Sequence, residues 1–297
     1  MKNDVQDNKL LTIAIPTYNR RAYLEECLNH ICPQLNDKVK VVVRDNKSFN
    51  YDFDEFITPY KEKYGVEAYQ NVCNIGGDAN FARLFETCTT KWLWILGDDD
   101  YIKPNIIEEI VTVLEQHPNE LFIYFTSPYE GLVKGLPEFA EAMKGMSAFA
   151  NAFFISVGFH NIEKGKNDIF FTYKYLSMKI SQIIRVMMHL KQDSNATCYF
   201  THKQILDTHG EDTCWKHDEM IIPYLTMFDV FRSERKVLKD NIFRCIAGKL
   251  MHYISFADLS FRDKLYYWHQ IFVKYGYFNT LRYNIKNIIG IFYRKYS

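Results

Sequence analysis

Short apolar runs alternate with stretches of helical periodicity along the first part of the chain. The runs have the length and apolar content of buried strands, and we expect strands at residues 10–15, 39–45, 66–71, 92–96 and 121–126. Segments between them carry apolar residues at i, i+3, i+4 and i+7, which is typical of one-sided helices. These stripes are Leu24, Cys27, Leu28 and Ile31; Phe81, Leu84, Phe85 and Cys88; and Ile107, Ile110, Val111 and Leu114. The alternation predicts an α/β fold with a mostly parallel central sheet flanked by helices.

Prolines and weaker periodicity shape the remaining predictions. Pro104 suits the first position of the third of these helices. The polar, aromatic segment that ends at Tyr64 is interpreted as a helix interrupted at Pro59. Residues 127–168 show few clear periodicities. Further along, the pattern predicts a helix at 179–190, a short strand and helix over 199–209, and an apolar helical run at 220–225.

Polar residues follow several of the predicted strands directly. Thr17, Asp45, residues 71–77 and the triplet Asp98 to Asp100 all lie at carboxyl ends of strands. Parallel α/β sheets bind their ligands at that edge. Each feature also has a structural interpretation: Asp45 could close a strand, Thr17 and Asn19 could serve a turn or a helix cap, and Gly76 could provide a tight turn. Their convergence favours a site.

The aspartate triplet is the feature with the clearest chemistry. Neighbouring carboxylates repel one another, and a cation held between them relieves that repulsion. Oxygen ligands favour a hard ion, so we expect Mg²⁺ or Mn²⁺, bound through one or two carboxylates and the phosphates of a substrate. The alternative is an exposed acidic turn that caps the helix near Pro104.

Composition excludes several classes of protein. The 297 residues include 36 basic and 36 acidic ones, a net charge of +0, which argues against a nucleic-acid binder that relies on a general positive field. Seven scattered cysteines fit reduced thiols better than a disulfide framework or a zinc site. The polar start is neither a signal nor a transit peptide, and no apolar stretch is long enough to span a bilayer. We therefore expect a cytoplasmic protein.

Four motifs in order, IAIPTYNR, VVVRD, NIGGDANFAR and ILGDDD, resemble those of the family-2 glycosyltransferases. The resemblance implies an inverting, nucleotide-sugar-dependent enzyme with the Rossmann-like GT-A fold. It places Pro16, Thr17, Tyr18, Asn19, Asp45, Asn74, Gly76, Asp98 and Asp99 around the donor. Thr17 and its neighbours would line the nucleoside pocket, and Asp45 would accept a hydrogen bond from the base. Asp98 would meet the ribose or the metal, and Asp100 or Asp99 would hold the metal beside the diphosphate.

The resemblance also implies a general base in an acidic motif at the start of a late helix. Asp218 is the first choice and Glu219 the second, because an apolar run follows them directly; Asp212 is the third. Acidic residues are also favoured in the first turn of any helix, so a purely structural role is the alternative.

The chain ends in a basic and aromatic segment, with no Asp or Glu after Asp263. Such a segment suits an interfacial helix on anionic lipid at the inner face of the membrane, a terminal helix packed on the domain, or an oligomer contact. We divide the chain into a donor-binding half (1–126), an acceptor-binding half with the base (127–235) and a helical C-terminal extension (236–297).

The expected partners are a nucleoside diphosphate sugar, with a UDP-sugar as first choice, and a glycan or lipid-linked acceptor. Surface-polysaccharide synthesis is the expected setting. The rivals are a sugar-nucleotidyltransferase, whose glycine-rich loop is missing from IPTYNRR, and a non-catalytic nucleotide- or carbohydrate-binding protein of the same fold.

Overall fold

The computed structural model describes residues 8–144, 154–209, 219, 221–238, 242–243, 246, 250–251, 253–255 and 257–276. Its centre is an eight-stranded sheet in the order β3-β2-β1-β4-β8-β6-β9-β7. The strands are β1 (Leu11–Thr17), β2 (Val39–Asp45), β3 (Glu67–Gln70), β4 (Trp92–Ile95), β6 (Phe122–Tyr124), β7 (Gly131–Lys134), β8 (Gly158–Asn161) and β9 (Thr197–Phe200). Six of them run in parallel, and β8 and β7 run in the opposite direction. The predicted α/β fold with a mostly parallel sheet is confirmed.

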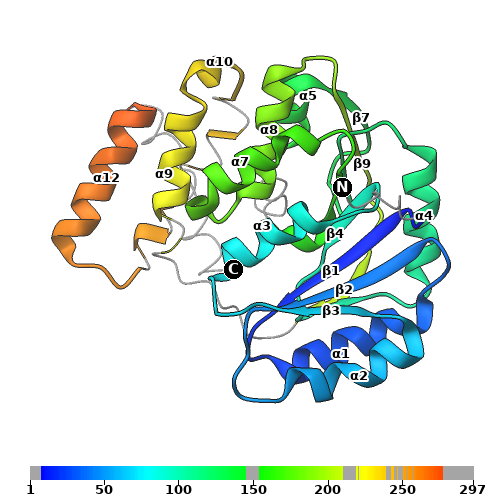
Figure 1. The fold of residues 1–297 in the computed structure, drawn as a ribbon. Helices are drawn as coiled ribbons and strands as arrows, with labels where there is room; N and C mark the ends of the chain where they lie inside the picture. Colours follow the sequence, from blue (N-terminus) through cyan, green and yellow to red (C-terminus); the bar gives the residue numbers. More distant parts are fainter. Residues whose placement is uncertain are drawn as a thin grey trace, which may run out of the picture.

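Helices cover both faces of this sheet (Figure 1). One face is covered by α1 (Arg21–Ile31), α2 (Phe53–Tyr64) and α4 (Ile106–Gln116). The other is covered by α3 (Gly77–Thr87), α5 (Gly135–Ala142), α7 (Ile169–Lys174) and α8 (Ser181–Gln192). The first and third predicted stripes are buried at every position; in the second, Leu84 and Phe85 are buried while Phe81 and Cys88 are only partly so.

A further helical layer packs on the second half of the sheet. It contains α9 (Ile221–Val230), α10 (Arg235–Leu238) and α12 (Phe261–Tyr275). In Figure 1, α12 is the outermost helix and α9 lies between it and the rest of the fold. One hydrophobic core continues from β6 and β9 through α8 into these helices. No helix in the described ranges has the length and apolar character needed to cross a bilayer.

Three predictions about local structure are wrong. The alternative of an exposed acidic turn also fails for Asp100, which is buried and begins a short strand, β5 (Asp100–Ile102), that pairs with β10 (Leu206–His209). The helix predicted near the end of 199–209 is therefore a strand, stabilised by pairing across the fold. Pro104 precedes α4, because Asn105 adopts a left-handed conformation (φ 60°) before the helix begins. The helix α2 continues through Pro59 rather than breaking there.

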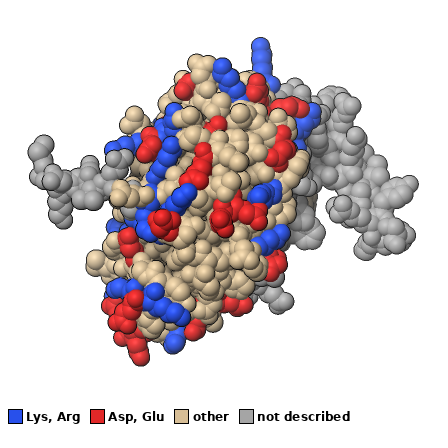
Figure 2. All heavy atoms as spheres, turned by 90° about the vertical axis from the view of Figure 1, so that its right-hand side faces the viewer, with Lys and Arg blue, Asp and Glu red and all other residues tan. Residues whose placement is uncertain are grey.

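Charges of both signs are interspersed on the surface. Figure 2 shows Lys and Arg beside Asp and Glu across the face that carries α4, with neither sign dominating it. This agrees with the net charge of +0.

Candidate active site

Three of the predicted polar residues meet where β1, β2 and β4 end. Thr17 and Asp45 are register partners at the last positions of β1 and β2. On the other side of β1, the Thr17 hydroxyl donates a hydrogen bond of 2.7 Å to the Asp98 carboxylate. All three side chains are buried. The parallel register thus places Thr17 between the two carboxylates at one edge of the sheet.

The three aspartates of the triplet point to different partners. Arg20 joins two of them, with its guanidinium 3.0 Å from an Asp98 oxygen and 2.7 Å from an Asp99 oxygen. Asp100 instead accepts a 2.5 Å hydrogen bond from the hydroxyl of Ser156, which also accepts from the backbone N–H of Gly97. The turn is therefore held from both sides, by the loop after β1 and by the segment before β8.

Gly97 is required by the close packing of this turn. A side chain there would place its first carbon 2.5 Å from the Asp100 carboxylate, which is closer than atoms approach without displacement. The glycine before the triplet thus allows Asp100 to fold back towards Ser156.

Burial dominates the electrostatics of Asp98. It raises the pKa of this carboxyl to about 7, although Arg20 and the Thr17 hydroxyl favour the charged form. The carboxylates of Asp99 and Asp100 act in the same direction as burial. Asp98 thus lies where additional positive charge would be stabilised.

Asp45 organises the loop that follows β2. Its oxygens accept hydrogen bonds from the Ser48 N–H (2.8 Å), the Ser48 hydroxyl (2.5 Å) and the Gln70 amide (2.8 Å). The Ser48 hydroxyl also accepts from the backbone N–H of Asn19, which has a left-handed φ of 57°. The loops after β1 and β2 are thereby joined through one serine.

Aromatic side chains frame these two loops. Tyr18 is partly buried, and its ring meets that of Phe49 edge-on at 6.2 Å, while Phe49 itself is 79% exposed. The hydroxyl of Tyr51 is buried near Thr17 and Ser48, and within the described residues it makes no hydrogen bond of good geometry. Burial raises the pKa of Tyr51, with the Asp45 and Asp98 carboxylates acting in the same direction. Pro16 lies partly exposed beside Thr17.

The loop before α3 is built from asparagine side chains. Asn46 donates to Asn74 (2.8 Å) and accepts from Asn71 (3.0 Å) and from the N–H of Ile75 (3.0 Å). Asn74 in turn accepts from the N–H of Gly76, whose φ of 84° favours glycine. Asn46, which follows Asp45, thus holds the loop of Asn74 and Gly76 at the same edge of the sheet. Both predicted donor residues are exposed there.

Of the three candidate bases, Glu219 is the one that lies within the described residues. Its carboxylate lies 2.7 Å from the Lys179 ammonium, in a partly buried ion pair. Asp78, in the first turn of α3, feels both charges; burial raises its pKa, Lys179 lowers it and Glu219 raises it. The start of α9 therefore faces the helix that follows the Asn74 loop. Asp218 and Asp212 lie outside the described residues.

A divalent ion fits the chemistry of the triplet without being enclosed by it. The described residues contain no group of three or more acidic, histidine or cysteine side chains arranged around one point. The carboxylates do offer oxygen ligands only, and Arg20 already shows that Asp98 and Asp99 share a cation. An ion held by one or two of them, with the remaining ligands from a diphosphate, suits this arrangement.

Several residues at this edge were not predicted. Arg20, Ser48, Asn46 and Ser156 have ordinary surroundings in the sequence, and only the fold brings them to the triplet or to Asp45. Arg20 was the easiest to find, since it ends the motif IAIPTYNR.

A known protein family matches more than half of the chain. The model of glycosyl transferase family 2 matches residues 12–179, and the chain belongs to this family. Among curated relatives, the abequosyltransferase RfbV of Salmonella typhimurium is 32% identical over 110 residues, which cover 36% of this chain and 33% of that protein. An uncharacterized glycosyltransferase of Haemophilus influenzae is 28% identical over 126 residues, 42% of each chain. The chain thus spans less than half the length of these relatives.

Solved structures match over most of the chain. Residues 1–349 of TarS from Staphylococcus aureus superpose with a TM-score of 0.58 at 12% identity, covering 90% of this chain and 89% of that one. The mannosyltransferase PcManGT from Pyrobaculum calidifontis, in complex with GDP-Man and Mn²⁺, gives 0.51 at 14% identity, covering 94% and 86%. At these identities the likeness shows the fold, and the predicted GT-A architecture is confirmed.

Proposed function

We propose that this protein transfers a sugar from a nucleoside diphosphate sugar to a hydroxyl of a glycan or lipid-linked acceptor, with inversion, in surface-polysaccharide synthesis. The observation that carries the proposal is the meeting of Thr17, Asp45 and Asp98 at the carboxyl edge of three adjacent strands, with Arg20 bridging the triplet. Ligands of parallel α/β sheets bind at this edge. Membership of glycosyl transferase family 2 supports the reaction class.

We infer a UDP-sugar as the donor. TarS has been solved in complex with UDP-GlcNAc and with UDP, and it is named a poly(ribitol-phosphate) β-N-acetylglucosaminyltransferase. The complex of PcManGT with GDP-Man leaves a guanine donor as the second candidate.

In this proposal the nucleoside lies against the loops after β1 and β2. Pro16, Thr17, Tyr18 and Asn19 line its pocket, and Asp45 meets the base or holds the loop that does. Asp98 and Asp99 face the ribose and diphosphate, and Asn74 and Gly76 close the site from the side of α3.

Metal binding is assigned to Asp98 and Asp100, with Asp99 as the alternative ligand. Mg²⁺ or Mn²⁺ there would neutralise the charge that develops on the diphosphate as it leaves. Arg20 supplies positive charge to the same carboxylates and would have to share them with the ion.

The base is assigned to Asp218, with Glu219 as second choice. A general base must be free to accept the proton of the acceptor hydroxyl. The Glu219 carboxylate is already paired with Lys179, which suits a residue that positions its neighbour. This pair also fixes the start of α9 opposite α3.

The test is calorimetric titration of uridine and guanosine diphosphates and their sugars, with and without Mn²⁺. We expect UDP compounds to bind and Mn²⁺ to strengthen binding. Asp98→Asn, Asp99→Asn and Asp100→Asn keep the shapes of the side chains while removing their charges. Replacing an aspartate that binds the metal should weaken nucleotide binding in the presence of Mn²⁺ about 10- to 100-fold, the typical effect of losing a charged contact.

Glu62→Gln, an exposed acidic residue on α2, is the matched control and should bind normally. A silent Asp100→Asn, together with strong effects at the other two positions, would move the metal to Asp98 and Asp99. If all three variants keep full turnover, the metal proposal is wrong. Nucleotide binding without any transfer would favour the binding-protein alternative.

A further inference from the structure

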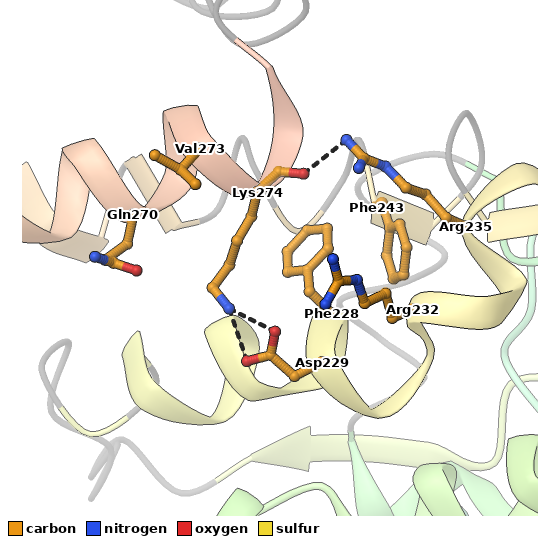
Figure 3. Close-up of a pocket in the computed structure, with 8 residues that line it drawn as sticks. All are labelled: Phe228, Asp229, Arg232, Arg235, Phe243, Gln270, Val273 and Lys274. Carbon is orange, nitrogen blue, oxygen red and sulfur yellow. Dashed lines mark hydrogen bonds and ion pairs between the residues drawn. The ribbon is translucent and has the colours of Figure 1, made fainter.

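A pocket of about 240 Å³ lies between α9 and α12, within the C-terminal helical layer. Its lining comes from three separate parts of the chain, as Figure 3 shows. The residues are Phe228, Asp229, Arg232, Arg235, Phe243, Gln270, Val273 and Lys274.

The pocket carries an excess of positive charge. Lys274 is neutralised by Asp229, with ammonium-to-carboxylate distances of 2.6 and 2.7 Å. Arg235 donates to the backbone carbonyl of Lys274 (2.8 Å). Among the described residues neither Arg232 nor Arg235 has an acidic partner, and neighbouring Glu234 pairs with Lys191. The lining residues therefore include two more basic than acidic side chains.

The rest of the lining is apolar. The rings of Phe228 and Phe243 pack 4.3 Å apart, and both line the pocket. Val273 lines it from α12 and is 60% exposed, so the pocket opens beside the outer face of that helix. Guanidinium groups over an apolar wall suit a phosphate attached to an apolar molecule.

The outer face of α12 continues this apolar character. Phe261 is 72% exposed, Tyr266 58% and Leu265 47%, and Arg262, Asp263 and His269 also lie exposed on this helix. Ile271 on the opposite side is fully buried against the core, so the helix is docked by one face and leaves the other unpartnered within the described chain. Exposed aromatic and apolar residues interspersed with basic ones are typical of helices that lie in a membrane interface.

We propose that the pocket between α9 and α12 binds the phosphate of an anionic membrane lipid while the outer face of α12 enters the lipid surface. The guanidiniums of Arg232 and Arg235 provide the charge complementarity, and the exposed side chains of α12 provide the apolar contact. This proposal concerns binding of the protein to lipid and does not depend on the transfer reaction proposed above.

The test is co-sedimentation of the full-length protein with two kinds of vesicle in the absence of donor. One is phosphatidylcholine alone, and the other is phosphatidylcholine mixed with an equal amount of phosphatidylglycerol. We expect binding to the mixed vesicles only. Arg232→Gln should weaken that binding about fivefold, the effect of about 1 kcal/mol per basic residue near an anionic surface. Tyr266→Ser should weaken it about tenfold by removing apolar contact.

The matched control is Lys61→Gln, which removes one exposed positive charge from α2 on the other side of the sheet. It should bind as the unaltered protein does. Both test residues are exposed, and circular dichroism of each variant checks the fold. The proposal is overturned if the protein shows no preference for anionic vesicles, or if Lys61→Gln loses as much as Arg232→Gln. Saturable binding of inorganic phosphate that Arg232→Gln weakens, without vesicle binding, would overturn the lipid as ligand and assign a soluble phosphate compound instead.

Discussion

Two clusters of buried polar residues lie in different halves of this molecule, and they differ in what surrounds them. The first is the edge formed by Thr17, Asp45 and the triplet, where the side chains lie at strand ends and Phe49 is exposed in the loop after β2. We call it the open edge. The second lies between β8 and α8. There Arg185 is 3.3 Å from a His160 nitrogen and donates to the Gly165 carbonyl at 3.1 Å.

Aromatic rings enclose this second cluster of His160 and Arg185, which we call the closed cluster. The Phe85 and Phe122 rings lie 4.9 and 5.0 Å from that of His160, and Arg185 sits over Phe85. Burial lowers the pKa of Arg185 to about 10, and it also lowers the pKa of His160, with Arg185 contributing. Displaced pKa values therefore occur in both clusters, while only the first lies at the carboxyl edge of the strands, where parallel α/β sheets bind their ligands. A shifted pKa therefore indicates a functional site only where a ligand can reach the group.

The largest expected effect tests whether the acidic segment before α9 supplies the general base for the proposed site at the open edge. Asp218→Asn should lower turnover about 10²–10⁴-fold, the usual loss for a positioned base, while nucleotide affinity stays nearly unchanged. Steady-state kinetics and calorimetry on the same preparation measure the two quantities. Glu219→Gln is the matched variant, and because Lys179 already holds Glu219 its loss should be smaller.

Other results would move the base. A collapse of Glu219→Gln or Asp212→Asn, with Asp218→Asn losing less than about tenfold, would reassign it to that residue. Should none of the three matter, the open edge binds nucleotide without this chemistry.

A second prediction tests the closed cluster through its pH dependence. Because the pKa of His160 is lowered in the folded protein, the unfolded chain binds a proton first as pH falls. Stability from this group is present above about pH 6.5 and is lost below it, by about 2 kcal/mol between about pH 7 and about pH 5. The raised pKa of Asp98 acts in the opposite direction over this range, so the effect of His160 is measured as a difference between variants. On going from about pH 7 to about pH 5, the free energy of unfolding from urea titrations should change less favourably in the unaltered protein than in His160→Gln, by about 2 kcal/mol.

The exposed residue His269 supplies the control for this measurement, since His269→Gln should follow the pH dependence of the unaltered protein. If His160→Gln also follows it, His160 does not contribute this loss. A large change in nucleotide affinity in this variant would contradict the separation of the two clusters.

The sequence predicted those strands whose pattern is contained within the strand itself, and it missed those that depend on contacts with distant segments. The strands β1, β2 and β4 are apolar runs, and their polar ends converge because parallel strands share a carboxyl edge. The strand β8 was missed: its sequence GFHN has no strand periodicity, and it is buried because β4 and β6 flank it. The pair β5 and β10 depends on contact between segments about a hundred residues apart.

The same limit applies within the site. The residue types and positions of Asp45 and the triplet indicated a binding site in the sequence. The sequence did not indicate which residues would contact these carboxylates. Ser156 reaches Asp100 from 56 positions away, and Arg20 reaches Asp98 and Asp99 from the loop after β1. Two of the three carboxylates therefore looked free in the sequence and are shared with one arginine in the fold.

The smallest expected effect concerns Phe49, which distinguishes the open edge from the closed cluster most directly. Its ring is 79% exposed and meets Tyr18 edge-on, while its backbone N–H is bound by the Asn19 side chain. An exposed ring held in this way offers a face on which a nucleobase can stack, an interaction worth about 1–3 kcal/mol per base in other nucleotide-binding sites. Phe49→Ala should therefore weaken UDP binding about fivefold or more in calorimetry. Because the side chain is exposed, the free energy of unfolding should stay within about 0.5 kcal/mol. Phe170→Ala, at a 62% exposed ring on α7, is the matched control and should change neither quantity. Equal affinities for Phe49→Ala and the unaltered protein would remove Phe49 from the donor site and leave Tyr18 as the aromatic residue to test there.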